Sequence, residues 1–236
     1  MTKTKSKWWA KYKLVFALTI IILSLVAFTN DRLISTTKAI SLIANSQGLT
    51  EPTSWNFGGN HDVYNAGIDN QISQHGQKSA FLESVVNNPT GFCTLLQTFI
   101  KKDFMGKRIK MTGYIKSQGL NDTATMWVRV DDTDKKMSTD FDNMMYRPIV
   151  GTKDWTKCEI IFDIPYRGVV FYGFIFLGVG KVWVDNVSFE VVDSSTAKTT
   201  QTLNKPFPDQ YIEQLKQYPL GNELPERIPV NLDFEE

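Results

Sequence analysis

Two apolar segments, residues 169–177 and 181–192, constrain the fold of this chain more than any other part of its sequence. Aromatic and β-branched residues stand at nearly every position, so both faces of each segment are apolar. Gly178 and Gly180 interrupt the run between them. Short runs of this kind are typical of strands that are buried on both sides. The two segments therefore predict the buried back of a β-sandwich.

Other β-like segments precede this pair at regular intervals. In the segment 108–116, apolar Ile109, Met111 and Ile115 alternate with polar residues, as a half-buried antiparallel strand requires. Several short strands separated by turn residues favour a sandwich or a barrel over an α/β sheet. The strands that we expect from the sequence are residues 79–86, 92–99, 108–116, 125–130, 157–164, 169–177 and 181–192.

The composition is that of a globular protein with no dominant charge. Of 236 residues, 42% are hydrophobic and 22% are charged, which suits one sizeable all-β domain with accessory segments. The 26 basic residues are balanced by 25 acidic residues. No overall field attracts a polyanion, so we expect no nucleic-acid partner.

The N-terminal residues 1–30 combine a basic flank with an apolar run. The uncharged run covers residues 14–28, and Trp8, Trp9 and Tyr12 precede it where an aromatic belt lies at a bilayer surface. Five lysines before the run keep the N-terminus cytoplasmic: Lys3, Lys5, Lys7, Lys11 and Lys13. We predict an uncleaved signal anchor, a single-pass membrane protein and a C-terminal domain outside the membrane. The alternative is secretion after signal cleavage.

The rest of the chain divides by composition. Residues 31–48 are expected to be a stalk and residues 49–192 the sandwich domain. Residues 193–236 begin with a Ser/Thr-rich linker, continue with a short helix over residues 208–218, and end in a strand-like tail. We expect the tail to add a strand to its own domain or to a neighbouring copy, with a disordered tail as the alternative.

The order of several motifs resembles a bacterial β-sandwich domain that is appended to AraC-type transcriptional regulators, erythromycin-esterase-like proteins and peptidases. The residues that carry the resemblance are Trp55 and Gly59; His75, Gly76, Ser79 and Ala80; Gly91, Phe92, Thr94, Leu95 and Gln97; Gly106 to Arg108, Gly113 and Tyr114; Met126, Trp127 and Arg129 to Asp131; Phe141 to Met144; Arg147 to Ile149; Gly151, Thr152, Asp154 and Trp155; and Val182, Trp183 and Asp185 to Val187. The resemblance implies an antiparallel jelly-roll sandwich of the galactose-binding-like type, to which many carbohydrate-binding modules belong. No helix-turn-helix pair accompanies it, so DNA binding is not inferred.

The two cysteines, Cys93 and Cys158, stand in segments that would be neighbouring strands in such a jelly roll. Outside the membrane a disulfide between them is chemically permitted. The alternative is a pair of buried free thiols that pack as small hydrophobic groups. A catalytic thiol is not expected. The two histidines that could act as its general base, His61 and His75, both lie in turn-like sequence.

Motifs of known enzyme chemistry are absent. The sequence contains no Gly-x-Ser-x-Gly elbow, His-Glu-x-x-His motif, phosphate-binding glycine loop or Cys-x-x-Cys pair. Neighbouring carboxylates such as Asp131 and Asp132 make a glycosidase formally conceivable, but acidic surface loops are far commoner than catalytic pairs. We therefore expect no enzymatic activity.

A carbohydrate site would combine aromatic rings with planar polar groups. Alternation places Met126, Val128 and Val130 toward the core and the residues between them on the other side. The candidate ligand-binding residues are Trp127, Arg129, Asp131, Asp142, Asn143 and Tyr146. The alternative is that these side chains hold the sandwich together, with Arg129 paired to Asp131 or Asp142.

Asp185 is the candidate metal ligand. In the carbohydrate-binding jelly rolls that the chain resembles, an aspartate in this position of the last strand often helps to hold a structural calcium ion. The alternative is a carboxylate that accepts hydrogen bonds from nearby backbone. We expect no other cofactor.

Together these observations predict a non-catalytic, membrane-anchored module outside the cytoplasm that binds a carbohydrate or another cell-envelope ligand. The alternative is a protein-interaction or sensory module, related to domains of transcriptional regulators but without a DNA-binding domain of its own.

Overall fold

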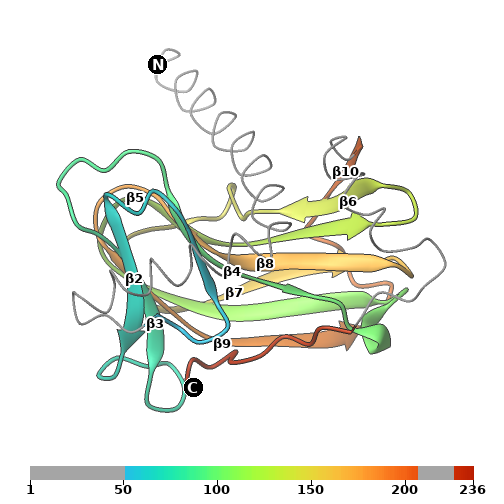
Figure 1. Ribbon diagram of the computed structural model, residues 1–236, viewed down its shortest axis with the longest axis horizontal. Helices are drawn as coiled ribbons and strands as arrows, with labels where there is room; N and C mark the ends of the chain where they lie inside the picture. The colour runs from blue at the N-terminus through green and yellow to red at the C-terminus, as the bar shows by residue number, and fades with distance from the viewer. Residues whose placement is uncertain (1–50, 207–225) are drawn as a thin grey trace.

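The computed structural model describes residues 51–206 and 226–236, and the regular structure of these residues is β-strand apart from one short 3-10 helix (Figure 1). The strands within these ranges are β1 (Asn56–Gly59), β2 (Tyr64–Asp69), β3 (Ser79–Ser84), β4 (Cys93–Phe99), β5 (Arg108–Asp132), β6 (Met137–Asp142), β7 (Ile149–Asp163), β8 (Gly168–Phe176), β9 (Lys181–Val192) and β10 (Gln201–Pro206). A short 3-10 helix, η1 (Lys102–Phe104), follows β4. The prediction of an all-β domain is confirmed for the described residues.

The strands pair antiparallel and form two layers that share one long strand. Residues 124–132 of β5 pair with β6 and β8, and with β10, β4 and β1 these make the β8 layer. Residues 108–118 of β5 pair with β7 and β9, and with β3 and β2 these make the β9 layer. The 25-residue β5 therefore runs from one layer into the other, and the nearly closed sheet is consistent with a β-sandwich or jelly roll.

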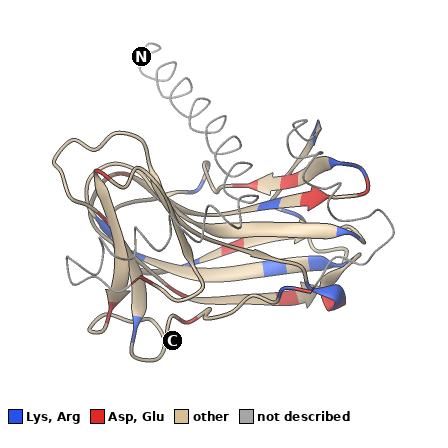
Figure 2. Cartoon of the chain, in the orientation of Figure 1, with Lys and Arg blue, Asp and Glu red and all other residues tan. Residues whose placement is uncertain are grey.

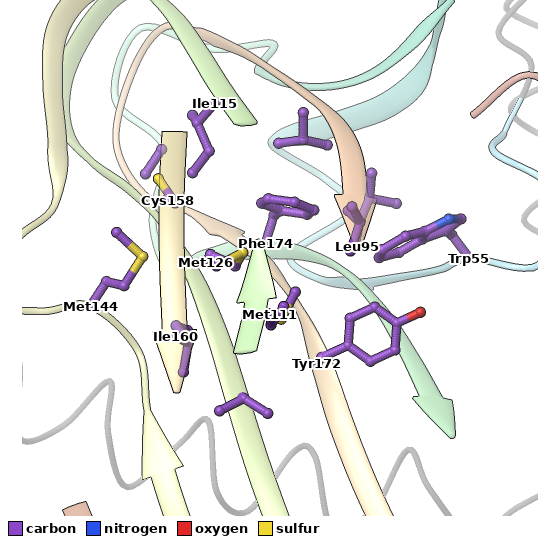
Figure 3. Close-up of a cluster of buried hydrophobic side chains, with 14 of the residues drawn as sticks. Trp55, Leu95, Met111, Ile115, Met126, Met144, Cys158, Ile160, Tyr172 and Phe174 are labelled. Atoms are coloured by element: carbon purple, nitrogen blue, oxygen red, sulfur yellow. The ribbon is translucent and has the colours of Figure 1, made fainter. Parts of the chain in front are cut away.

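Side chains from both layers fill a main core between them (Figure 3). Met126, Tyr172 and Phe174 enter it from the β8 layer, and Met111 and Ile160 enter it from the β9 layer. In β5 the residues at alternate positions point into this core because successive side chains of a strand lie on opposite faces. The predicted inward direction of Met126, Val128 and Val130 is confirmed.

All nine residues of β8 are buried, and no charged residue interrupts this strand (Figure 2). Val170, Tyr172, Phe174 and Phe176 face the main core. The alternate residues belong to a second apolar cluster on the other side of the β8 layer, which we call the outer-face cluster: Phe92, Leu96, Trp127, Val169, Phe171, Ile175 and Leu177, with Ile100 packed against them. The two-sided apolar pattern thus identified a strand that is covered on both faces. The same expectation for residues 181–192 is wrong at the end of β9, where Ser188, Glu190 and Val191 are exposed.

Several elements differ from the sequence prediction. The segments 108–116 and 125–130, expected as two strands, are parts of the single strand β5. The short strands β1, β2 and β6 were not predicted, and β10 lies within the expected linker. β10 has the sequence Gln-Thr-Leu-Asn-Lys-Pro, in which apolar and polar residues do not alternate, so no pattern marked it as a strand.

The C-terminal tail, residues 226–236, lies against its own domain. Arg227 forms an isolated antiparallel bridge with Ile100, and the backbone N–H of Val187 donates to the carbonyl of Leu232 at 2.8 Å. Phe234 has no solvent-exposed surface and packs into the main core. The tail is held in irregular conformation rather than as an added strand.

The predicted signal anchor over residues 1–30 and the stalk over residues 31–48 lie outside the described residues, as does the predicted helix over residues 208–218. Within the two described ranges, no helix has the length and apolar character that crossing a membrane requires.

Candidate functional site

The structure places Trp127, Arg129 and Asp131 together on the outer face of the β8 layer. They occupy alternate positions of β5 and lie opposite Gly173, Phe171 and Val169 of β8. This is the side that the alternation predicted. The three residues are only 1%, 2% and 0% exposed, respectively, so the alternative, in which they hold the sandwich together and Arg129 pairs with Asp131, describes this structure.

Trp127 is held by the outer-face cluster and by one hydrogen bond. Its indole Nε1 donates to Thr94 Oγ1 at 3.1 Å, and the Thr94 hydroxyl donates in turn to the carbonyl of Phe174 at 2.7 Å. This chain of hydrogen bonds satisfies the polar atom of a buried ring. Trp127 therefore joins β5 to β4 across β8.

Arg129 lies between an aromatic ring and a carboxylate. Its guanidinium carbon lies 4.2 Å from the centroid of the Phe171 ring, and its Nη2 donates to Asp131 Oδ2 at 3.0 Å. Asp131 Oδ1 accepts from the Ser138 hydroxyl at 2.7 Å. Arg129 Nε is buried and has no acceptor among residues 51–206 and 226–236. The site thus contains a buried charge pair with one unused donor.

Sequence reasoning missed the partners that complete this arrangement. Phe171, Thr94 and Ser138 contact the predicted residues from β8, β4 and β6, respectively. Phe171 could have been found from the two-sided apolar pattern of residues 169–177, since a strand with apolar residues on both faces needs a partner on each. Thr94 and Ser138 carry no comparable signal.

The other predicted ligand-binding residues lie at the end of β6 and in the turn that follows it, and they are not part of this group. Asp142 accepts from the backbone N–H of Met144 at 2.7 Å and from Arg147 Nη2 at 2.6 Å. Asn143 Oδ1 accepts from the N–H of Met145 at 3.2 Å. Both side chains thus stabilise the turn, as Asp and Asn commonly do. Tyr146 points to solvent and is 67% exposed.

Asp185 does not fit the predicted calcium site. Its Oδ2 accepts backbone N–H groups of Gln74 and His75 at 2.7 and 3.0 Å, and its Oδ1 accepts the N–H of Asn186 at 2.6 Å. Backbone N–H groups therefore surround both carboxylate oxygens, whereas a calcium ion bound to Asp185 would need further oxygen ligands in those positions. Burial raises the pKa of Asp185, while the three N–H groups act in the opposite direction. In the described part of the chain, no group of three or more acidic, histidine or cysteine side chains is arranged to hold a metal.

The predicted disulfide between Cys93 and Cys158 is not formed; both are free and buried. Cys93 lies on β4 in the β8 layer, whereas Cys158 lies on β7 in the β9 layer, so the two strands are not neighbours. The alternative of two packed thiols describes this structure. Burial raises the pKa of Cys158 to about 12 and raises the pKa of Cys93 well above its ordinary value.

We expect both thiols to resist alkylation in the folded protein, because the reactive thiolate is scarce and access is blocked. A maleimide mass-tag assay at neutral pH should show no modification without denaturant and two modifications in 6 M guanidinium. Rapid labelling of either cysteine in the native protein would contradict the burial described here.

No protein-family model matches this chain. A curated relative, the "Uncharacterized HTH-type transcriptional regulator YbfP" of Bacillus subtilis (strain 168), is 34% identical over 185 residues, which cover 77% of this chain and 56% of the relative. The chain thus spans little more than half the length of the curated relative that it matches.

Solved structures with a similar fold include carbohydrate-binding modules. TmCBM61 in complex with β-1,4-galactotriose has a TM-score of 0.44 at 9% identity, covering 60% of this chain and 91% of the module. The family 11 module of Clostridium thermocellum, in complex with a mixed-linked tetrasaccharide, has a TM-score of 0.43 at 12% identity, covering 59% and 89%. The enzymatically active domain of bacteriophage CBA120 tailspike protein 4 has a TM-score of 0.48 at 16% identity, covering 60% and 20%. Because the structural similarity and the sequence identity are both low, the function is inferred from the residues of the site.

Proposed function

We propose that the protein is a non-catalytic binding module that binds a cell-envelope carbohydrate on the outer face of the β8 layer. The face offers the rings of Trp127 and Phe171 beside the charged pair Arg129 and Asp131. Sugars are bound by rings that contact their apolar faces and by planar polar groups that hydrogen-bond their hydroxyls. The residues of this face supply both kinds of contact.

The observation that carries the proposal is the unused donor at Arg129 Nε. A buried donor without an acceptor costs about 1–3 kcal/mol. A ligand hydroxyl beside the guanidinium would supply the missing acceptor. Because the face is closed to solvent in this structure, the proposal includes a conformation in which it is open.

The binding test compares two phenylalanines with matched surroundings. Phe171 lies under Arg129 in the β8 layer, whereas Phe81 lies under Lys181 in the β9 layer, with Lys181 Nζ 4.0 Å from the ring centroid. Affinity electrophoresis of the purified protein against soluble glucans, galactans, xylans and cell-wall polymers should show retardation by at least one polymer. Phe171→Leu should abolish the retardation, and Phe81→Leu should retain it.

Equal loss in both variants, or in neither, would contradict the assignment of the site to this face. Circular dichroism on each variant shows whether a loss of binding merely reports unfolding. If the native protein is retarded by no polymer, the carbohydrate proposal is wrong.

A sensory or protein-interaction module is the second candidate function, and the name of the B. subtilis relative supports it. In this proposal the chain corresponds to a portion of a regulator that receives a signal rather than binds DNA. Crosslinking in cells followed by mass spectrometry, with no polymer retardation in the preceding test, would favour this function.

The location outside the membrane is also a proposal, and the basic flank and apolar run of residues 1–30 support it. Protease added to intact spheroplasts should remove a C-terminal tag. Protection of that tag until lysis would contradict this location.

A further inference from the structure

The tail contacts the edge of the β8 layer through backbone and side-chain hydrogen bonds. Ile100 and Arg227 exchange two backbone hydrogen bonds of 2.8 and 2.9 Å beyond the end of β4. The Gln97 amide then donates to the carbonyl of Val230 at 2.7 Å and accepts its N–H at 3.3 Å. These contacts set the register of the tail before its last residues turn into the domain.

Asn231 is recognised through its side chain as well as its backbone. Its carbonyl accepts the indole N–H of Trp55 at 2.9 Å, and its Nδ2 donates to the carbonyl of Thr53 at 2.9 Å. Its Oδ1 accepts the N–H of Glu236 at 3.2 Å. A residue without the amide would lose both side-chain bonds.

Phe234 is the apolar anchor of the tail. Its ring stacks on Trp55, with a centroid distance of 5.0 Å and an angle of 29° between the planes. Phe234 and Asn231 both have left-handed backbone, with φ of 57° and 46°. This conformation is unfavourable for a bulky residue such as phenylalanine, so the surrounding contacts must impose it.

Glu235 is bound by a loop that is shaped to receive a carboxylate. Its Oε1 accepts the backbone N–H groups of Gln77 and Lys78 at 2.6 and 2.9 Å, and the Lys78 ammonium donates to its carbonyl. A Cβ at Gly76 would lie 2.2 Å from this oxygen, and the φ of Gly76 is 66°. The glycine therefore permits the close approach of the carboxylate.

We propose that the surface formed by Trp55, Gln97 and the 76–78 loop is a recognition site for the segment Asn231–Glu235, and that the tail of a second copy of this chain can occupy it. The recognised groups are an amide, an aromatic ring and a carboxylate at fixed spacing, which makes the site specific for sequence. The 19 residues 207–225 separate the tail from β10. Even partly extended, a connection of this length reaches a neighbouring molecule, since an extended chain spans about 3.3 Å per residue.

The first experiment uses the full chain with a site-specific protease sequence placed within residues 207–225. After cleavage, the tail should remain bound during gel filtration and should be displaced by excess fluorescent peptide of residues 226–236. A peptide with Phe234→Ala should bind about 100-fold more weakly, because it lacks the buried ring. A peptide with Ile228→Ala should bind like the native peptide, since Ile228 is 55% exposed.

Failure of the native peptide to bind the cleaved protein, or equal binding of the Phe234→Ala peptide, would overturn the recognition site. The second-copy proposal is tested by co-expressing two differently tagged full-length chains. They should co-purify, and Glu235→Gln should reduce the yield of the mixed species at least several-fold. Peptide binding without any mixed species would show that the site is used only within one chain.

Discussion

Arg129→Ala should lower the free energy of unfolding by about 3–5 kcal/mol, because it breaks a buried ion pair by removing one of its two members. Asp131 has no exposed surface, and its Oδ2 accepts from Arg129 Nη2 at 3.0 Å. The substitution also removes the guanidinium from the Phe171 ring. Urea unfolding followed by tryptophan fluorescence measures the change.

The matched control is Lys157→Ala, which breaks an ion pair of similar length in solvent. Lys157 Nζ lies 2.7 Å from Glu159 Oε1, and the two side chains are 50% and 42% exposed. Exposed pairs of this kind contribute little to stability because solvent screens them. A cost for Arg129→Ala no larger than that of the control would contradict the burial of the Arg129–Asp131 pair.

Phe234→Ala is expected to cost about 3–5 kcal/mol, although the residue is the third from the end of the chain. The ring is completely buried and stacks on Trp55, so its removal leaves a cavity in the main core. The midpoint of urea unfolding should therefore fall.

Ile228→Ala is the control for the tail, because Ile228 is 55% exposed and its truncation should change stability by less than about 0.5 kcal/mol. Equal midpoints for native protein and Phe234→Ala would mean that the tail does not contribute to the core in solution.

The sequence was sufficient to predict the all-β fold and the direction of side chains along β5. Alternation depends only on the pleat of a strand, so the placement of Met126 and Trp127 on opposite faces followed directly. Alternation does not show whether the second face is covered. Polar Arg129 and Asp131 suggested open surface, and their mutual pairing is what allows them to be buried.

The remaining features depend on contacts between residues that are distant in sequence. Trp55 and Asn231 are 176 positions apart and share a hydrogen bond, which no local pattern encodes. The pairing of β10 with β6 is formed by backbone groups that any residue except proline possesses. The absence of a Cys93–Cys158 disulfide likewise depends on which layer each strand joins.

The passage of β5 through both layers affects how the domain can unfold. This one strand pairs with β6 and β8 through one half and with β7 and β9 through the other, so the two layers are joined by the covalent chain of β5. A force that pulls on one layer is therefore transmitted to the other layer through the covalent backbone of β5. We therefore expect the two layers of the native protein to unfold together in one cooperative step.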